Sequence, residues 1–354
     1  MSFPPRVSFT ITNACNLRCR MCGQWSETGY IRKSGPGKTE MQLADWKRLV
    51  DEMAAHGVSW VLIRGGEPFL FPGIIQLLED LRAKGIEVSI DTNGTMLKQF
   101  AADLVRLDGV NMTISVDGPE EVHDAVRGVK GSFRRIEEGL AALREQEQAT
   151  GRTIERTICF TVSPYSLRGL GDMPEVARRL GIPAIHFVPY YYFPEAVGKK
   201  YEEELRGLSG HAFSWRGFQH EDSGVDFEEF LRQLRKFRAT LGSVKFAPFL
   251  ELTEDEYRTW FSDASTPVRS QECWNLDGLI DIQPDGEANF CLDFPDYSFG
   301  NVRNSTIEEV WNGERAEKFR EFRRKKSLAV CHRCGAKYIS APPGLATVPN
   351  QSEA

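Results

Sequence analysis

The feature that most constrains the fold is an alternation of β-branched and amphipathic segments over about the first 190 residues. Expected strands lie at 6–12, 58–63, 86–90, 110–116, 154–162 and 184–189. Expected helices lie at 72–84, 97–107, 132–148 and 173–180, after a first helix that opens at Thr39, with Thr39 and Gln42 as its capping pair, and ends before Gly57. Such alternation predicts right-handed βαβ units and a parallel sheet. Six units favour an open, partial (β/α)6 TIM-like barrel in an α/β chain, with the chemistry at the C-terminal strand ends.

The alternation ends near residue 195, and the pattern beyond it divides the rest of the chain. We expect a barrel core at 1–194, a bridging segment at 195–270 that shapes the substrate site and holds one clear helix at 227–241, a cysteine-bearing domain at 271–338 and a disordered tail at 339–354. Within 271–338 the sequence predicts a hairpin at 279–292, with a Pro-Asp-Gly turn, and a charged helix at 306–326.

The chain lacks a visible signal peptide and any run of about 18 apolar residues, so we expect a cytoplasmic protein with no membrane span. Its formal net charge of -6 gives no support for a nucleic-acid partner. The eight cysteines should then be reduced, and seven of them form two groups, which is typical of metal ligands. The eighth, Cys159, lies inside an expected strand, and we expect it to be buried with no chemical role.

Cys15, Cys19 and Cys22 lie in the loop directly after the first expected strand. Cubane iron–sulfur clusters are usually held by four ligands, so three thiolates leave one iron open. An open coordination position marks a catalytic metal site. The alternative is a zinc-binding loop, which needs a fourth ligand, and the first histidine of the chain is His56.

This loop resembles the CxxxCxxC signature of the radical SAM superfamily. The resemblance implies a [4Fe–4S] cluster whose open iron is chelated by the amino and carboxylate groups of S-adenosylmethionine. It also implies reductive cleavage of that cofactor to a 5′-deoxyadenosyl radical, with Met21 placed against the adenine. Because cleavage consumes an electron, a small donor such as a flavodoxin or ferredoxin is the expected partner.

Further segments resemble the family's cofactor-binding motifs at later strand ends. Gly65, Gly66, Glu67 and Pro68 resemble its GGEP motif, in which glycines allow close backbone approach and carbonyl and carboxylate oxygens accept from the cofactor ammonium. By the same resemblance Asn93 follows the third strand, and Ser115 and Asp117 hydrogen-bond the cofactor's carboxylate or ribose. Arg127 would pair with the methionine carboxylate through its bidentate fork. The alternative for each is a turn or a surface ion pair.

Four more cysteines, Cys273, Cys291, Cys331 and Cys334, are enough to ligate one [4Fe–4S] cluster or one zinc ion. Their setting resembles the twitch domain, a shortened SPASM domain of radical SAM dehydrogenases and peptide maturases, and implies one auxiliary [4Fe–4S] cluster. That cluster can accept an electron, orient the substrate or brace the fold. Asp293 lies near where relatives place a proton-accepting acid; the alternative is an aspartate in a turn.

The expected function is hydrogen-atom abstraction from a peptide or small-molecule substrate, followed by oxidation or bond formation. The alternatives are a non-catalytic iron–sulfur or zinc-binding electron-transfer module and a radical SAM methyltransferase. The segment Tyr190–Phe193 either lines the substrate cavity or packs under a loop. Because the first strand begins close to residue 1, we expect no preceding peptide-recognition domain, so a peptide would need a separate recognition protein or direct docking.

Overall fold

A single β-sheet organises the structure. The computed structural model describes residues 3–34, 39–270 and 273–338. The strands in these ranges form one ten-stranded sheet in the order β10-β9-β8-β1-β2-β3-β4-β5-β6-β7. Their bounds are β1 Val7–Thr10, β2 Trp60–Arg64, β3 Glu87–Thr92, β4 Val110–Ser115, β5 Arg156–Val162, β6 Ala184–Pro189, β7 Lys245–Phe246, β8 Ile280–Ile282, β9 Glu287–Asn289 and β10 Gly300–Asn301.

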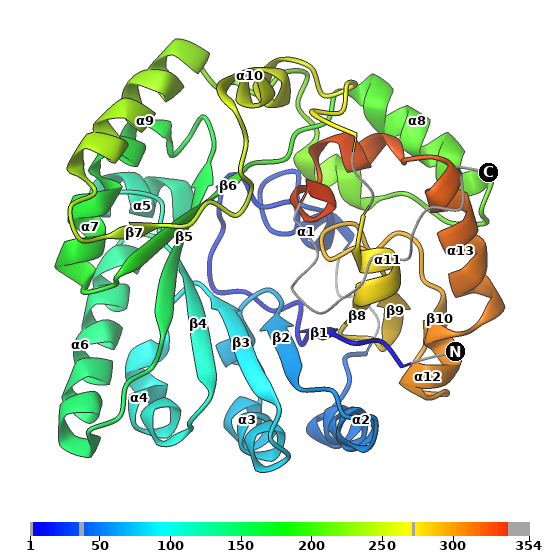
Figure 1. The fold of residues 1–354 in the computed structure, drawn as a ribbon, viewed down its shortest axis with the longest axis horizontal. Coiled ribbons are helices and arrows are strands. Elements are labelled where there is room, and N and C mark those ends of the chain that lie inside the picture. Colours follow the sequence, from blue (N-terminus) through cyan, green and yellow to red (C-terminus); the bar gives the residue numbers. More distant parts are fainter. Residues whose placement is uncertain (1–2, 35–38, 271–272, 339–354) are drawn as a thin grey trace, which may run out of the picture.

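The strands β1 to β6 are parallel and stand side by side in sequence order, which confirms the expected partial barrel. The short strand β7 extends this run, parallel to β6. The sheet ends at β7 on one side and at β10 on the other, so the barrel stays open. Figure 1 shows the strands in an arc with helices along its outer side.

The helices alternate with the strands as the sequence pattern predicts. On the outer side of the barrel they are α2 Leu43–Ala55, α3 Ile74–Ala83, α4 Leu97–Arg106, α5 Glu120–Arg127, α6 Ser132–Thr150 and α7 Met173–Leu180. The expected start of the first of these is wrong. Helix α2 begins at Leu43, where the backbone N–H of Gln42 donates to Asp45 at 2.8 Å, so the capping pair is Gln42 and Asp45.

Side chains along the barrel strands alternate between an apolar outer face and a polar inner face. In β5, Ile158 and Phe160 are fully buried, whereas Thr157 and Cys159, which alternate with them, are partly exposed. The strands β4 and β6 repeat this alternation of buried and partly exposed positions. Period-two alternation in each strand therefore gives the barrel a solvent-accessible inner wall.

The segment 195–270 holds more regular structure than the single helix expected from its sequence. It contains α8 Glu195–Arg206, α9 Phe227–Thr240 and α10 Glu254–Ser262. Helix α9 packs on the barrel, where Lys236 pairs with Asp172 at 2.6 Å. Helix α8 reaches the C-terminal region instead, because Glu204 accepts from the backbone N–H of Ala329 at 2.7 Å.

The C-terminal region continues the barrel sheet. Strand β8 pairs in parallel with β1, Val7 opposite Ile280, and β9 returns antiparallel to β8. The expected turn at 284–286 joins β8 to β9, with Gly286 at φ 86°. The expected helix at 306–326 is two helices, α12 Ile307–Trp311 and α13 Glu314–Lys325, because Gly313 lies at the N-cap of the second.

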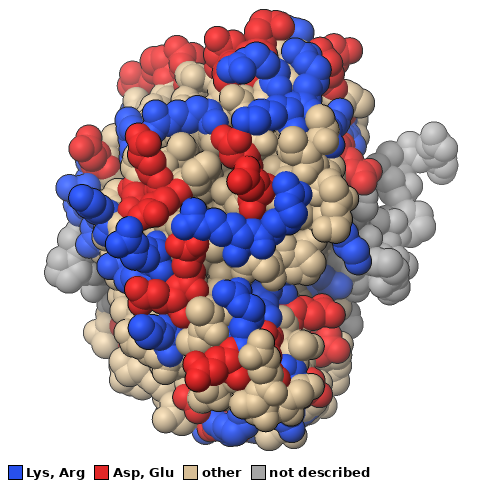
Figure 2. Space-filling model, turned by 90° about the vertical axis from the view of Figure 1, so that its left-hand side faces the viewer, with Lys and Arg blue, Asp and Glu red and all other residues tan. Residues whose placement is uncertain are grey.

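Two short helices complete the described structure, α1 Tyr30–Ser34 and α11 Asn275–Gly278. No helix in the described ranges has the length and apolar character needed to cross a membrane. The tail expected at 339–354 lies outside the described residues. On the face covered by α6, α7 and α9, Lys and Arg alternate with Asp and Glu (Figure 2), as in the Arg179–Glu137 pair at 2.6 Å.

Candidate active site and cluster-binding cysteines

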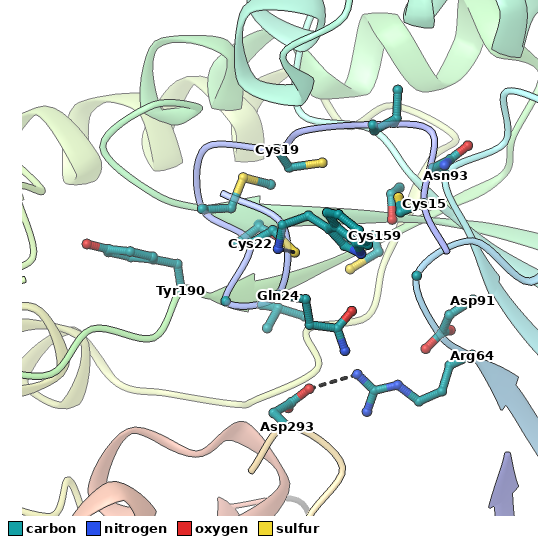
Figure 3. A pocket seen from close by; sticks show the side chains of 18 of the residues that line it. Cys15, Cys19, Cys22, Gln24, Arg64, Asp91, Asn93, Cys159, Tyr190 and Asp293 are labelled. Atoms are coloured by element: carbon teal, nitrogen blue, oxygen red, sulfur yellow. Dashed lines mark hydrogen bonds and ion pairs between the residues drawn. The ribbon is translucent and has the colours of Figure 1, made fainter. Parts of the chain in front are cut away.

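A cavity of about 330 Å³ opens at the C-terminal ends of the barrel strands. Its wall combines the loop after β1, the ends of β2 to β6, Tyr30, Arg127 at the end of α5, Phe218 of the 195–270 segment and Asp293 of the C-terminal region. Figure 3 shows the three cysteines of the first loop on one side and the Arg64–Asp293 pair on the other. The residues in this wall that the sequence predicted are Cys15, Cys19, Met21, Cys22, Gly65, Gly66, Asn93, Ser115, Arg127 and Asp293.

The cysteine loop is held in place by the C-terminal end of α5. The backbone N–H groups of Arg18 and Arg20 donate to the carbonyls of Arg127 and Val126, at 3.1 and 2.9 Å. Gly128 follows α5 at φ 72°, and a Cβ there would lie 2.5 Å from the carbonyl oxygen of Arg18. Helix α5 was missed from the sequence, and it is one of the elements that fix the cysteine loop.

The three thiols of this loop share a buried environment. Burial raises the pKa of Cys15 and of Cys19 to about 11, and it raises the pKa of Cys22 as well. Arg127 opposes the shift at Cys19, where its Nη1 donates to Sγ at 3.7 Å. Since iron binds the thiolate form, loading the site must displace three protons from Cys15, Cys19 and Cys22.

The loop after β2 passes so close to the loop after β1 that it needs two glycines, Gly65 and Gly66. The backbone N–H of Gly66 donates to the carbonyl of Thr12 at 2.8 Å, and the N–H of Glu67 donates to that of Ala14 at 2.7 Å. A Cβ on Gly66 would lie 2.1 Å from the carbonyl oxygen of Ala14. Gly65 and Gly66 also line the cavity, so the glycine pair serves the loop contact and leaves backbone facing a ligand.

Glu67 and Pro68 are not among the residues that line the cavity, and the contact of Glu67 with the cofactor stays a prediction. The Glu67 carboxylate is fully buried and accepts from Thr92 Oγ1 at 2.7 Å, from the N–H of Asn93 at 2.8 Å and from the N–H of Phe69 at 3.2 Å. Burial raises its pKa to about 7. The end of β3 and the turn after Glu67 therefore hold this carboxylate with three hydrogen bonds, and Pro68 starts that turn as a short 3-10 helix.

Asp117 also lies behind the wall and not in it. It is fully buried, pairs with Arg127 Nε at 2.6 Å and accepts from the N–H of Thr161 at 3.2 Å. Asp117 thus supports Arg127, and its contact with the cofactor stays a prediction. Asn93 and Ser115 do line the cavity, and Asn93 is fixed by Asn16, whose Oδ1 accepts from its amide at 2.8 Å.

Several residues of the wall were missed from the sequence or given another role. Arg64 pairs with Asp293 at 2.8 Å, and Asp91 beside them is exposed to the cavity. Cys159, expected to be an inert buried residue, lies on the inner face of β5 and lines the cavity. The alternation of Cys159 with outward-facing Ile158 and Phe160 was the available signal, because it assigns the cysteine to the inner wall.

Tyr191 connects the cavity to the C-terminal cysteines. Its hydroxyl donates to Asp293 Oδ2 at 3.2 Å and accepts from the backbone N–H of Gly335 at 3.2 Å. Tyr190 and Tyr191 line the cavity, while Tyr192 and Phe193 are buried behind it. Two of the four aromatic residues therefore line the cavity, as one interpretation of this segment expects, and the other two are packed away from it, as the alternative expects.

The four C-terminal cysteines form a second buried group. Burial raises the pKa of Cys291 and of Cys334 well above the usual range, and the charges of Cys273 and Cys331 raise both further. In the part of the chain that the structure describes, no three Cys, His, Asp or Glu side chains converge tightly enough to hold one metal ion. A cubane cluster binds each thiolate at a different iron atom, so its ligands lie further apart than the ligands of a single metal ion. The set of three thiols and the set of four thiols fit such clusters.

Comparison with known proteins agrees with both cysteine sets. Residues 9–162 match the radical SAM superfamily, and residues 273–335 match the SPASM iron–sulfur cluster-binding domain. The chain belongs to the radical SAM superfamily. This radical SAM enzyme therefore uses S-adenosylmethionine and [4Fe–4S] clusters, with the first cysteine loop inside the superfamily match and the four later cysteines inside the SPASM match.

Relatives and solved structures cover most of this radical SAM enzyme. An AdoMet-dependent heme synthase of Methanosarcina barkeri is 26% identical, over 96% of this chain and 90% of its own. The antilisterial bacteriocin subtilosin biosynthesis protein AlbA of Bacillus subtilis is 23% identical, over 95% of this chain and 67% of its own. The crystal structure of Streptococcus suis SuiB shares the fold with a TM-score of 0.64 at 16% identity, over 96% of this chain and 72% of SuiB.

Proposed function

We propose that this radical SAM enzyme removes a hydrogen atom from a peptide or small-molecule substrate and then completes an oxidation or a bond formation with its auxiliary cluster. One observation carries the proposal. A single cavity is lined by the three cysteines of the first loop and by Asp293, which comes from the region of the four later cysteines. A substrate in that cavity lies between the two cluster sites.

The residues of the first loop supply binding and orientation. With S-adenosylmethionine bound at the cluster of Cys15, Cys19 and Cys22, the cofactor supplies a 5′-deoxyadenosyl radical. Arg127 would hold the methionine carboxylate, since its Nε is fixed by Asp117 and its Nη1 lies beside Cys19. Met21, Asn93 and Ser115 would contact the adenosyl part of the cofactor from the cavity wall.

Asp293 is our candidate for the group that accepts a proton when the substrate is oxidised. Its carboxylate faces the cavity, with Arg64 on Oδ1 at 2.8 Å and the Tyr191 hydroxyl on Oδ2 at 3.2 Å. Two donors on two oxygens fix the orientation of the carboxylate toward the substrate space. Arg64 and Tyr191 are then positioning residues for Asp293.

Asp91 is our candidate for a substrate contact. Two carboxylates line the cavity, Asp91 and Asp293, and Asp293 is paired with Arg64. Asp91 forms no ion pair among the described residues. Burial of its carboxylate raises its pKa. A hydrogen-bond donor of the substrate, such as an amide or amine N–H, would satisfy this carboxylate.

The named relatives differ in the substrates that their names indicate. The heme synthases act in tetrapyrrole synthesis by name, whereas AlbA is named for bacteriocin biosynthesis. We propose a peptide or small molecule without a narrower choice of class. A small electron donor such as a flavodoxin or ferredoxin would reduce the first cluster, and a cytoplasmic location fits eight free cysteines.

Cofactor cleavage in reduced, oxygen-free protein tests the proposal directly. We expect about eight iron atoms per chain after reconstitution and formation of 5′-deoxyadenosine from S-adenosylmethionine. Replacing Cys15, Cys19 and Cys22 with Ala should remove about half of the iron and abolish cleavage. Cys159→Ala is the matched control for iron content and should keep all of it. A triple variant that still cleaves the cofactor would contradict the assignment.

A further inference from the structure

Two buried cations lie in segments that contact the C-terminal cysteines. The backbone N–H of Lys337 donates to the carbonyl of Cys334 at 3.2 Å. Arg323 lies in α13, whose Arg320 donates to the carbonyl of Leu276, three residues after Cys273, at 2.8 Å. Arg323, in the last turn of α13, is 8% exposed, and Lys337 is 4% exposed. Neither forms an ion pair with a carboxylate among the described residues, whereas the neighbouring Arg324 pairs with Asp277 at 2.9 Å. Arg323 Nη1 donates to the carbonyl of Lys326 at 2.6 Å, which satisfies one of its five N–H groups.

Burying two like charges side by side is unfavourable unless an anion lies close to both. Burial and the charge of Arg323 both lower the pKa of Lys337. The thiols of Cys331, Cys273 and Cys334 act in the opposite direction and raise the pKa of Lys337. All four thiols of the group raise the pKa of Arg323. The counterion of both cations is therefore the cysteine set itself.

We propose that Arg323 and Lys337 raise the reduction potential of the auxiliary cluster and so make it an electron acceptor. This inference rests on the proposed function, in which that cluster takes an electron from the substrate. Reduction adds one negative charge to a cluster already carrying four thiolates. Cations held in a poorly solvated site favour the more negative, reduced state, because the interaction of opposite charges is strong where water is excluded.

The step that these cations assist balances in electrons and protons. The substrate radical left by hydrogen-atom abstraction loses one proton to a base and one electron to the oxidised cluster. The substrate ends two electrons more oxidised than it began, and 5′-deoxyadenosine carries the first hydrogen atom. Arg323 and Lys337 take no part in bond making, and they act through the charge that they place beside the four thiolates.

The test measures the midpoint potential of the auxiliary cluster alone. In full-length protein with Cys15, Cys19 and Cys22 replaced by Ala, a redox titration is followed by electron paramagnetic resonance without cofactor or substrate. Arg323→Gln and Lys337→Gln should each lower the potential by a tenfold change in the one-electron equilibrium constant, about 59 mV, or more.

Three further variants separate charge from packing. Arg323→Lys and Lys337→Arg retain the charge and should keep the wild-type potential, although Arg323→Lys changes the contact with Lys326. Arg324→Gln makes the same chemical change one residue away, on a half-exposed side chain, and should leave the potential unchanged.

Each result of the redox titration either supports or overturns the inference. Wild-type potentials in both neutral variants would overturn the inference, and so would loss of the cluster from both, which assigns the cations a purely structural role. If Arg323→Gln alone loses the cluster, Lys337→Gln decides, because the Lys337 side chain makes no hydrogen bond to the described residues. Since no cofactor is present in the titration, its result stands apart from tests of the proposed function, which depend on cofactor cleavage and product formation.

Discussion

Glu67 and Asp117 have a common role at the scale of single residues. Both match positions that the family resemblance assigns to the cofactor, and both are fully buried behind the cavity wall. Glu67 binds the end of β3, and Asp117 fixes Arg127. Each therefore holds a residue of the cavity wall, Asn93 in one case and Arg127 in the other.

Arg127→Lys tests the best-placed cofactor contact among these residues. An ammonium group cannot hold Asp117 and a second carboxylate with the fork geometry of a guanidinium. We expect the dissociation constant for S-adenosylmethionine to rise roughly tenfold or more, which corresponds to about 1.4 kcal/mol or more. Equilibrium binding to the fully loaded protein measures it, with iron content unchanged.

Arg134→Lys is the matched control for that variant. Arg134 is largely exposed and pairs with Glu120 outside the cavity, so its substitution should leave cofactor affinity at the wild-type value. Wild-type affinity in Arg127→Lys would remove Arg127 from the cofactor site.

At the scale of elements, the contact between the loops after β1 and β2 determines the position of the first cysteines. Gly66→Ala would place a Cβ 2.1 Å from the carbonyl oxygen of Ala14, so one loop must move. We expect the protein to retain its auxiliary cluster and lose most of the first one, about half of its iron after reconstitution. Iron analysis with spectroscopy of each cluster measures this.

Gly207→Ala provides the control for Gly66→Ala. Gly207 has helical backbone angles and its nearest neighbour would lie 3.4 Å from an added Cβ, so the substitution fits without movement. Full iron content in Gly66→Ala would show that the loop contact does not hold the cluster site.

The pairing of β8 with β1 depends on another buried carboxylate. Asp281 is fully buried in β8, accepts from Thr10 Oγ1 at 3.3 Å, and burial raises its pKa to about 6. Because the folded protein binds this proton more tightly than the unfolded chain, its stabilising contribution is complete below the unfolded pKa, about 3.8, and is lost as pH rises through about 6.

Asp281→Asn removes that titration. Relative to the variant, the wild type should gain roughly 1 kcal/mol in free energy of unfolding between about pH 7 and about pH 5. Denaturant unfolding of protein with matched iron content measures the difference, and Asp103→Asn, on an exposed helix position, should follow the wild type. A difference between wild type and Asp281→Asn that stays constant with pH would contradict the shift.

Elements with strong periodicity were predictable from the sequence, and those set by tertiary contacts were not. The strands β1 to β6 and the helix α7 agree closely with the pattern, because outward-facing apolar residues recur at the period of each element. Helix α5 is short and charged, and α8 lies in the segment 195–270, where only the helix at 227–241 was expected. Its buried side, Val197, Tyr201 and Leu205, is recognisable only when the partner surface is known.

At the scale of the whole molecule, one cavity separates two cluster sites. The link between them is the Tyr191 hydroxyl, bound to Asp293 on the cavity side and to the backbone of Gly335, which follows Cys334. Cysteine spacing predicted the two iron–sulfur domains that the family matches show, since clustered cysteines leave a clear sequence signal. Arg64 ends β2, Asp91 lies in the neighbouring strand β3 and Tyr191 follows β6, so these three residues are far apart in the sequence and no local pattern brings them together.

Replacing Cys331 and Cys334 with Ala tests how the two sites divide the reaction. The first cluster should remain and cofactor cleavage should persist, because none of its ligands is touched. Formation of oxidised product should fall at least tenfold, since the substrate radical has lost its electron acceptor. Circular dichroism and protease resistance check that the C-terminal region stays folded. A folded variant that forms product at the wild-type rate would rule out an acceptor role.

The pairing of β1 with β8 also bears on how the protein is made. Thr10 and Asp281, which meet across this pairing, are 271 residues apart in the chain. At roughly 5 to 20 residues per second, the ribosome needs on the order of ten to fifty seconds to bring the second strand out after the first. Throughout that interval one edge of β1 presents unpaired backbone groups immediately before Cys15. A chaperone that covers strand edges during translation would therefore have to cover this edge of β1 until residue 280 emerges.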